Sequence, residues 1–314
     1  MQNIFQQLDD LLEKVDFEAI WPGFAPCEYI LFIDNRGYLK GEEIPWTSYM
    51  ACTAMDYEGR VVATWVIENP DDIDFERVAS GLAHEMFHAF QSSQNDRRGP
   101  DEFALFAYPQ DLENYQLKLA ENNYLAKAFA ENSMTALEQF ITLRKARARI
   151  IGDAIRQEWL CETGEGMAEY AGLMALNQLS PQKFAQDVDK HIAWLCDPES
   201  LFHVRRISYS VGCVMCLALK AVGIDFMHKL GDKRTLFEII PQSPGVVEEH
   251  LEKRRIMLKN KFDAVREGGK KNERKATIMG FDPMNMWYAG NEVLCDRFVI
   301  LDGEHIQGPL FCSL

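Results

Sequence analysis

Residues 81–91 of the chain read GLAHEMFHAFQ, a run with two histidines four positions apart and a glutamate directly after the first. The apolar residues around it recur at helical spacing, so we expect an α-helix here. Positions i and i+4 lie above one another on a helix, and His84 and His88 can therefore bind one tetrahedral Zn²⁺. Glu85 would then lie beside the open coordination position and act as a general base. The alternative is two helical histidines with a salt-bridging glutamate, and a third ligand would distinguish the two.

A second run, WLCETGEGMAEY at residues 159–170, offers candidates for that third ligand. With this run the chain resembles the gluzincin branch of the zinc metallopeptidases, which includes thermolysin and zinc aminopeptidases. In those families the third ligand is a glutamate on a second helix. The resemblance implies that Glu165 is this ligand and that one Zn²⁺ is bound per chain. It also implies that Glu169, one turn later, orients a ligand histidine.

Glu162 is the rival of Glu165, since positions three apart share a helix face. We favour Glu165 because Gly166, which follows it, would let a helix approach the metal closely. An ordinary amphipathic helix with exposed glutamates is the alternative for the whole segment.

Two other kinds of HExxH site fit less well. The metzincin pattern needs a glycine at position 91 and a histidine at position 94, and both are glutamine here. A deformylase-like site would take a cysteine, for which Cys161 is the one suggestive position.

A third run, ISYSVGCVMCLAL at residues 207–219, resembles the aminopeptidase segment whose tyrosine stabilises the oxyanion. By this resemblance Tyr209 is the candidate donor. A tyrosine that caps a packed helix is the alternative, and His203 is a second candidate donor.

The spacing of the motifs departs from these families. Between His88 and Glu165 lie 76 residues, a much longer separation than the resemblance implies. We expect residues 97–152 to form a helical insert that could cover the cleft. The strand expected at residues 61–69, VVATWVIEN, stands where gluzincins have the edge strand that binds substrate, and a peptide could pair with it.

Composition restricts the partners. The 314 residues include 33 Lys+Arg and 48 Asp+Glu, for a net charge of −15, with 47% hydrophobic residues. This is ordinary globular usage, and the acidic balance predicts no nucleic-acid partner. The most apolar stretch, residues 211–219, is far shorter than the ~20 residues of a membrane span. The first 17 residues lack the pattern of a secretory signal. We therefore expect a cytoplasmic protein with free thiols.

The order of patterns predicts an α+β fold that is predominantly α-helical. We expect a small antiparallel N-terminal sheet, a large helical body and a C-terminal β-hairpin that turns at residues 302–303. The resemblance implies a zincin-like catalytic unit over residues 1–314. Its expected parts are residues 1–96 with the sheet and active-site helix, the insert 97–152, a helical lobe 153–275 with the third ligand, and the hairpin 276–314.

These features together predict a zinc-dependent peptidase that acts on a peptide or protein substrate. A catalytically inactive zincin-like binding protein and a zinc hydrolase of a non-peptide substrate are the alternatives, because ligand motifs report the metal and not the substrate.

Overall fold

A computed structural model describes residues 1–227, 230–231, 233–241, 246–269, 276–281, 286–289, 292–295, 298–302, 304–307 and 310–313. The fold is α+β and mostly helical, as the sequence predicts. The chain divides into two compact units, Met1–Ser243 and Pro244–Leu314. Among the described residues, no helix combines the length and apolar character that crossing a membrane requires. The candidate site lies entirely within the first unit.

The N-terminal sheet is mixed, which corrects the expected antiparallel sheet. Its strand order is β3-β2-β1-β5-β4, with β1 (Tyr29–Ile33), β2 (Arg36–Leu39), β3 (Glu42–Ile44), β4 (Thr53–Tyr57) and β5 (Arg60–Ile67). Strand β2 pairs antiparallel with both β1 and β3, and β4 pairs antiparallel with β5. Strands β1 and β5, however, pair in parallel. Turn residues specify each hairpin locally and not how two hairpins join. All five residues of β1 are buried, which suits a central strand with a parallel neighbour.

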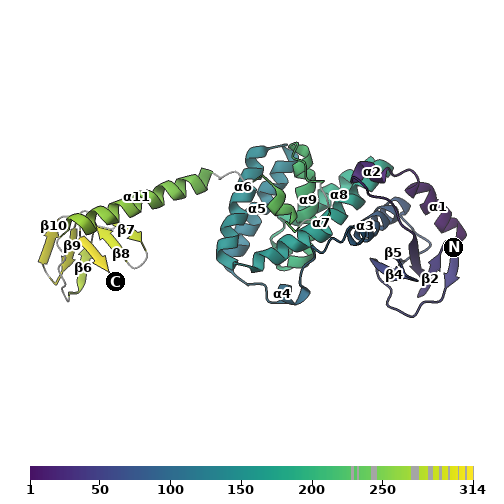
Figure 1. Cartoon of the computed structure of the whole chain (residues 1–314), viewed down its shortest axis with the longest axis horizontal. Helices are drawn as coiled ribbons and strands as arrows, with labels where there is room; N and C mark the ends of the chain where they lie inside the picture. The colour runs from purple at the N-terminus through teal and green to yellow at the C-terminus, as the bar shows by residue number, and fades with distance from the viewer. Residues whose placement is uncertain are drawn as a thin grey trace. The chain divides into compact units, whose positions relative to one another are not determined.

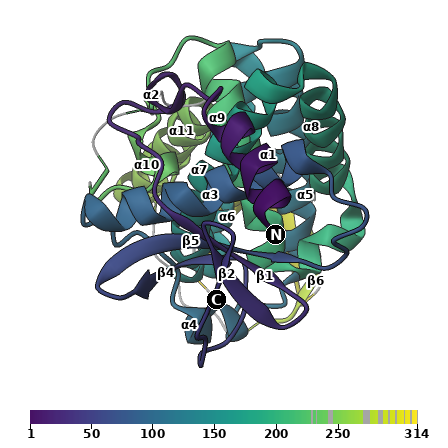
Figure 2. The same ribbon diagram turned by 90° about the vertical axis from the view of Figure 1, so that its right-hand side faces the viewer.

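One face of this sheet is covered by helix α3 (Phe75–Ser93), which packs on β4 and β5 (Figure 2). Helix α1 (Gln2–Leu12) packs against α3 in turn, and its buried side chains include Phe5 and Leu8. The short helix α2 (Phe17–Ile20) follows α1 and contacts α7. Helix α3 is therefore fixed between the sheet and the helical body.

The helical body is built around helix α7 (Ala154–Leu179), which packs against α3 on one side and α9 (Val204–Ala221) on another (Figure 1). Glycines allow both contacts. A Cβ atom on Gly166 would lie 2.4 Å from the Cα of Gly212 in α9, and one on Gly172 would lie 2.7 Å from the carbonyl oxygen of Ser80 in α3. Gly166 therefore serves the packing of α7 on α9.

The other helices surround this centre. They are α4 (Glu102–Phe106), α5 (Leu112–Ala130), α6 (Met134–Ile151), α8 (Pro181–Cys196), the 3₁₀ helix η1 (Pro198–Phe202) and α10 (Leu236–Ile239). The expected insert does contain a helical pair, α5 and α6, which pack on each other. Helix α5 also packs on α8 and α9, and α6 packs on α7.

The second unit begins with helix α11 (Val246–Gly268). Six strands follow: β6 (Ile278–Phe281), β7 (Met286–Ala289), β8 (Glu292–Cys295), β9 (Phe298–Leu301), β10 (Glu304–Gln307) and β11 (Leu310–Ser313). The expected hairpin is confirmed, because β9 and β10 pair antiparallel with Leu301 opposite Glu304. It belongs, however, to the three-stranded sheet β10-β9-β6, and β11-β8-β7 forms a second sheet. The boundaries expected at residues 96, 152 and 275 stay predictions.

Candidate metal centre

Helix α3 carries the two histidines and Glu85, as the sequence predicts. The helix begins after Asp74, whose side chain accepts a hydrogen bond from the backbone N–H of Arg77. The Nε2 atoms of His84 and His88 lie 3.1 Å apart. Within the described part of the chain, His84, Glu85 and His88 form a group that could hold a metal ion.

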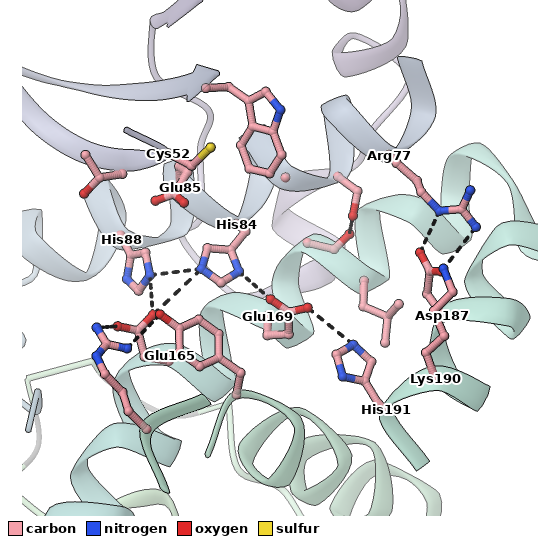
Figure 3. Close-up of a pocket in the computed structure, with 18 residues that line it drawn as sticks. Cys52, Arg77, His84, Glu85, His88, Glu165, Glu169, Asp187, Lys190 and His191 are labelled. Atoms are coloured by element: carbon pink, nitrogen blue, oxygen red, sulfur yellow. Dashed lines mark hydrogen bonds and ion pairs between the residues drawn. The ribbon is translucent and has the colours of Figure 1, made fainter. Parts of the chain in front are cut away.

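The structure brings Glu165 of α7 to the same point. Its Oε2 atom lies 3.1 Å from His88 Nε2 and 4.0 Å from His84 Nε2 (Figure 3). Ligand atoms at about 2.0–2.1 Å from a tetrahedral Zn²⁺ are about 3.3–3.4 Å apart. Two of the three separations, both 3.1 Å, are close to this spacing, and the third, 4.0 Å, is longer.

Each histidine is held through its other ring nitrogen, as metal-binding histidines usually are. His84 Nδ1 lies 2.8 Å from Glu169 Oε2, and His88 Nδ1 lies 2.8 Å from Gln91 Oε1. Gln91 in turn donates to the carbonyl oxygen of Gly164 at 3.1 Å, which ties α3 to α7. Both Nε2 atoms are thus left to face Glu165.

The polar chain continues from Glu169 into α8 and α9. Its other oxygen, Oε1, lies 3.3 Å from His191 Nε2, and His191 Nδ1 lies 2.9 Å from the hydroxyl of Ser210. Both oxygens of Glu169 are therefore engaged by imidazoles.

The acidic groups around His84 favour its protonated form. Burial alone would lower the pKa of His84, but Glu169, Glu85 and Glu165 outweigh it and raise the pKa to about 9. Burial would likewise raise the pKa of Glu165, but His88, His84 and Arg205 lower it to about 2. Burial raises the pKa of Glu85 above its ordinary value. A cation is thus favoured at this point, either as a proton on His84 or as a metal ion.

Tyr209 of α9 lies beside the centre. Its ring is stacked on that of His84 with the centroids 6.1 Å apart, and its hydroxyl accepts a hydrogen bond of 2.9 Å from Arg205. Arg205 also donates to Glu165 Oε1 at 3.0 Å. The oxygen of Glu165 that faces away from the histidines is therefore bound by a guanidinium.

The rival residues point elsewhere. Glu162 is buried and forms a two-bond ion pair with Arg144. The Cys161 thiol faces the carbonyl oxygen of Arg205, and the ring of His203 stacks on Trp194. None of the three lines the cavity at the centre.

That cavity has a volume of about 700 Å³ and is bordered by the sheet as well as by the helices. Trp65 of β5 packs on α3 where Gly81 leaves room, since a Cβ atom on Gly81 would lie 2.1 Å from the indole ring. Cys52, labelled in Figure 3, and Thr53, the first residue of β4, also line the cavity. Residues 97–152 contribute no described side chain to the lining.

The edge of the sheet corrects one expectation. Strand β5 has β1 on one side and β4 on the other, so it is not an edge strand. The strand at this edge is β4, and no described strand pairs with its outer side. The expectation for residues 61–69 was wrong by one strand. Composition does not show which of the two strands in a hairpin lies at the edge of the sheet.

Three residues at the centre were not found from the sequence: Gln91, His191 and Arg205. Two had usable signals, since Gln91 follows His88 by three positions and Arg205 precedes Tyr209 by four, both helical neighbours. His191 had none, because it reaches the site from a separate helix.

Comparisons with protein-family models, with curated proteins and with solved structures find no match to this chain.

Proposed function

We propose that this protein is a zinc-dependent peptidase. The observation that carries the proposal is the convergence of His84 Nε2, His88 Nε2 and Glu165 Oε2 at 3.1–4.0 Å with Glu85 beside them. Zn²⁺ held by these three residues would polarise a carbonyl group and acidify water. Glu169 and Gln91 would keep both imidazoles in the ligating tautomer.

The residues around the centre fit the proton transfers of amide hydrolysis. Glu85 would take a proton from the attacking water and deliver it to the nitrogen of the breaking C–N bond. Its pKa, raised by burial, favours this role because an effective base titrates near the working pH. The Tyr209 hydroxyl would donate to the oxyanion, with Arg205 holding the hydroxyl in place.

The outer side of β4, where no described strand pairs, supports a peptide as substrate. An extended chain could add to this edge through backbone hydrogen bonds and run past the metal centre, since Thr53 of β4 lines the cavity. This arrangement favours a peptide over a compact small molecule.

The test combines metal analysis with a peptide-library digest. We expect about one zinc per chain in the wild-type protein. The Glu85→Gln protein should keep the zinc while the cleavage rate falls by about 10²–10⁴-fold. Glu76→Gln makes the same change on the same helix away from the cavity and should leave the rate unchanged.

Near wild-type cleavage by Glu85→Gln would contradict the mechanism. Stoichiometric zinc without cleavage of any peptide would instead favour a binding protein or a hydrolase of a non-peptide substrate. The absence of zinc after zinc is supplied would overturn the metal centre itself.

A further inference from the structure

A second cavity of about 470 Å³ adjoins the metal centre on the side of α8 and α9. The two cavities share the lining residues Glu169, Lys190, His191 and Tyr209. Figure 3 shows Lys190 and His191 beyond Glu169, on the far side from His88. A substrate bound at the metal can therefore extend a group into this second space.

The second cavity is lined by cations with few counter-charges. Arg206 is exposed, and its guanidinium lies over the ring of Trp194 at 5.0 Å. Across the described residues, no carboxylate lies within ion-pair distance of Arg206. Lys190 is 68% exposed at its side chain, and its one ion-pair partner in the part of the chain that the structure describes is Asp187, which also binds Arg77.

The one carboxylate in this cavity is Glu169, and both its oxygens are bound by His84 and His191. It is therefore unable to turn toward the two cations. Of the two cations, Lys190 shares Asp187 with Arg77, while Arg206 has no carboxylate within ion-pair distance among the described residues. An exposed guanidinium of this kind is available to an anion, and guanidinium groups bind carboxylates especially well.

We propose that this cavity is a substrate subsite that binds a carboxylate, with Arg206 and Lys190 as specificity-determining residues and Trp194 as the apolar wall beside them. The inference rests on the proposed peptidase function, which sets the substrate at the metal. The carboxylate has two possible sources, a free C-terminus or an acidic side chain, and their chemistry at the guanidinium is the same.

The test measures binding rather than turnover, with zinc-loaded Glu85→Gln protein and calorimetry. One pair of acetylated hexapeptides ends in a free carboxylate or in an amide. The second comparison uses amidated hexapeptides that carry one glutamate, placed at each position in turn. Each is paired with the peptide that has glutamine at the same position. In at least one pair we expect the carboxylate form to bind about tenfold more tightly. The pair that shows the difference identifies the source.

The same ratios are then measured after a second substitution. Arg206→Gln should reduce the ratio to less than about threefold, and Lys190→Gln should reduce it in part. Lys127→Gln on α5 removes the same charge outside both cavities and should leave the ratio unchanged. A ratio that survives both Arg206→Gln and Lys190→Gln would place the carboxylate on the zinc ion and overturn the subsite.

Cleavage by the wild-type protein separates this inference from the proposed function. Cleavage without any carboxylate preference would overturn the subsite and leave the peptidase intact. Arg206-dependent binding without cleavage would support the subsite and overturn the peptidase. The absence of both binding and cleavage would overturn both.

Discussion

Helix α7 carries four buried or half-buried glutamates in sequence, and they belong to two different environments. Glu158 and Glu162 face α5 and α6, where they are enclosed with three cations. Glu165 and Glu169 face a cavity and lie against histidines. Glutamates spaced four, three and four positions apart on one helix thus lie in two different chemical environments.

The enclosed cluster brings three cations and three carboxyl groups together, although Glu121 Oε2 has no hydrogen-bond partner among the described residues. Its cations are Lys118, Arg144 and Arg147 and its anions are Glu121, Glu158 and Glu162, with side chains at most 1% exposed. Arginine keeps its proton at ordinary pH, and none of these six side chains is among the residues that line the cavity at the centre. At the other pair the partners are imidazoles, which can lose a proton and bind a metal instead. The two pairs of glutamates therefore differ in their partners, which are guanidinium and ammonium groups for Glu158 and Glu162 and imidazoles for Glu165 and Glu169. They also differ in that the second pair lines a cavity.

The sharpest way to break this comparison is to remove one glutamate from each environment. Glu165→Ala should abolish zinc binding, because loss of a ligand costs more than the ~10–100-fold that loss of an orienting partner costs. Glu162→Ala should keep about one zinc per chain. Elemental mass spectrometry after dialysis measures both. Zinc lost from Glu162→Ala and kept by Glu165→Ala would reverse the assignment.

The second effect is on folding rather than on metal. Glu162→Ala leaves Arg144 buried with one partner fewer, and breaking a buried ion pair costs about 3–5 kcal/mol of unfolding free energy. Urea denaturation followed by circular dichroism measures this loss. Glu131→Ala, at an exposed glutamate of 60% side-chain exposure, is the control and should change stability by less than about 0.5 kcal/mol. An equal loss in both variants would mean that the enclosed cluster does not stabilise the fold.

The two environments also differ in how far the sequence predicts them. The HExxH run has a fixed helical spacing, so the sequence predicts His84 and His88 directly, whereas Glu165 is predicted only through the resemblance of the EGMAEY run. The enclosed cluster has no such pattern, because its six charges come from three helices and pair only once those helices are packed. In the sequence they resemble ordinary solvated helix faces. His191 was missed for the same reason, since it reaches the site from a separate helix, and the parallel pairing of β1 and β5 was missed because the turns specify only local hairpins.

A smaller effect should follow from the residue that links the metal centre to α8. Glu169→Gln keeps the size of the side chain but removes the charge that faces His84 Nδ1 and His191 Nε2. We expect zinc affinity to fall by about 10–100-fold, with the protein still folded. Competition with a zinc-binding dye measures the dissociation constant. Unchanged affinity would show that Glu169 does not orient the ligand histidine.

The last effect is a change of about tenfold per pH unit in zinc affinity, and it tests whether the cavity-facing pair exchanges a proton for a metal. In the metal-free protein the carboxylates raise the pKa of His84 to about 9, above the ordinary 6.5. The bound proton therefore stabilises the metal-free fold below about pH 6.5, and this contribution is lost as the pH rises through 9.

Zinc must displace this proton, so its affinity should rise by about tenfold per pH unit between pH 7 and 9 and level off above that. Zinc titrations in metal buffers measure the slope, and the His84 ring signal in NMR spectra of the metal-free protein measures the pKa directly. In Glu169→Gln both the pKa and the slope near pH 8 should fall, since the largest acidic contribution is gone. A zinc affinity that is independent of pH in this range would mean that His84 carries no proton to exchange. The environment of His84 would then differ from that of the enclosed cluster in its access to a cavity and not in its ability to exchange a proton.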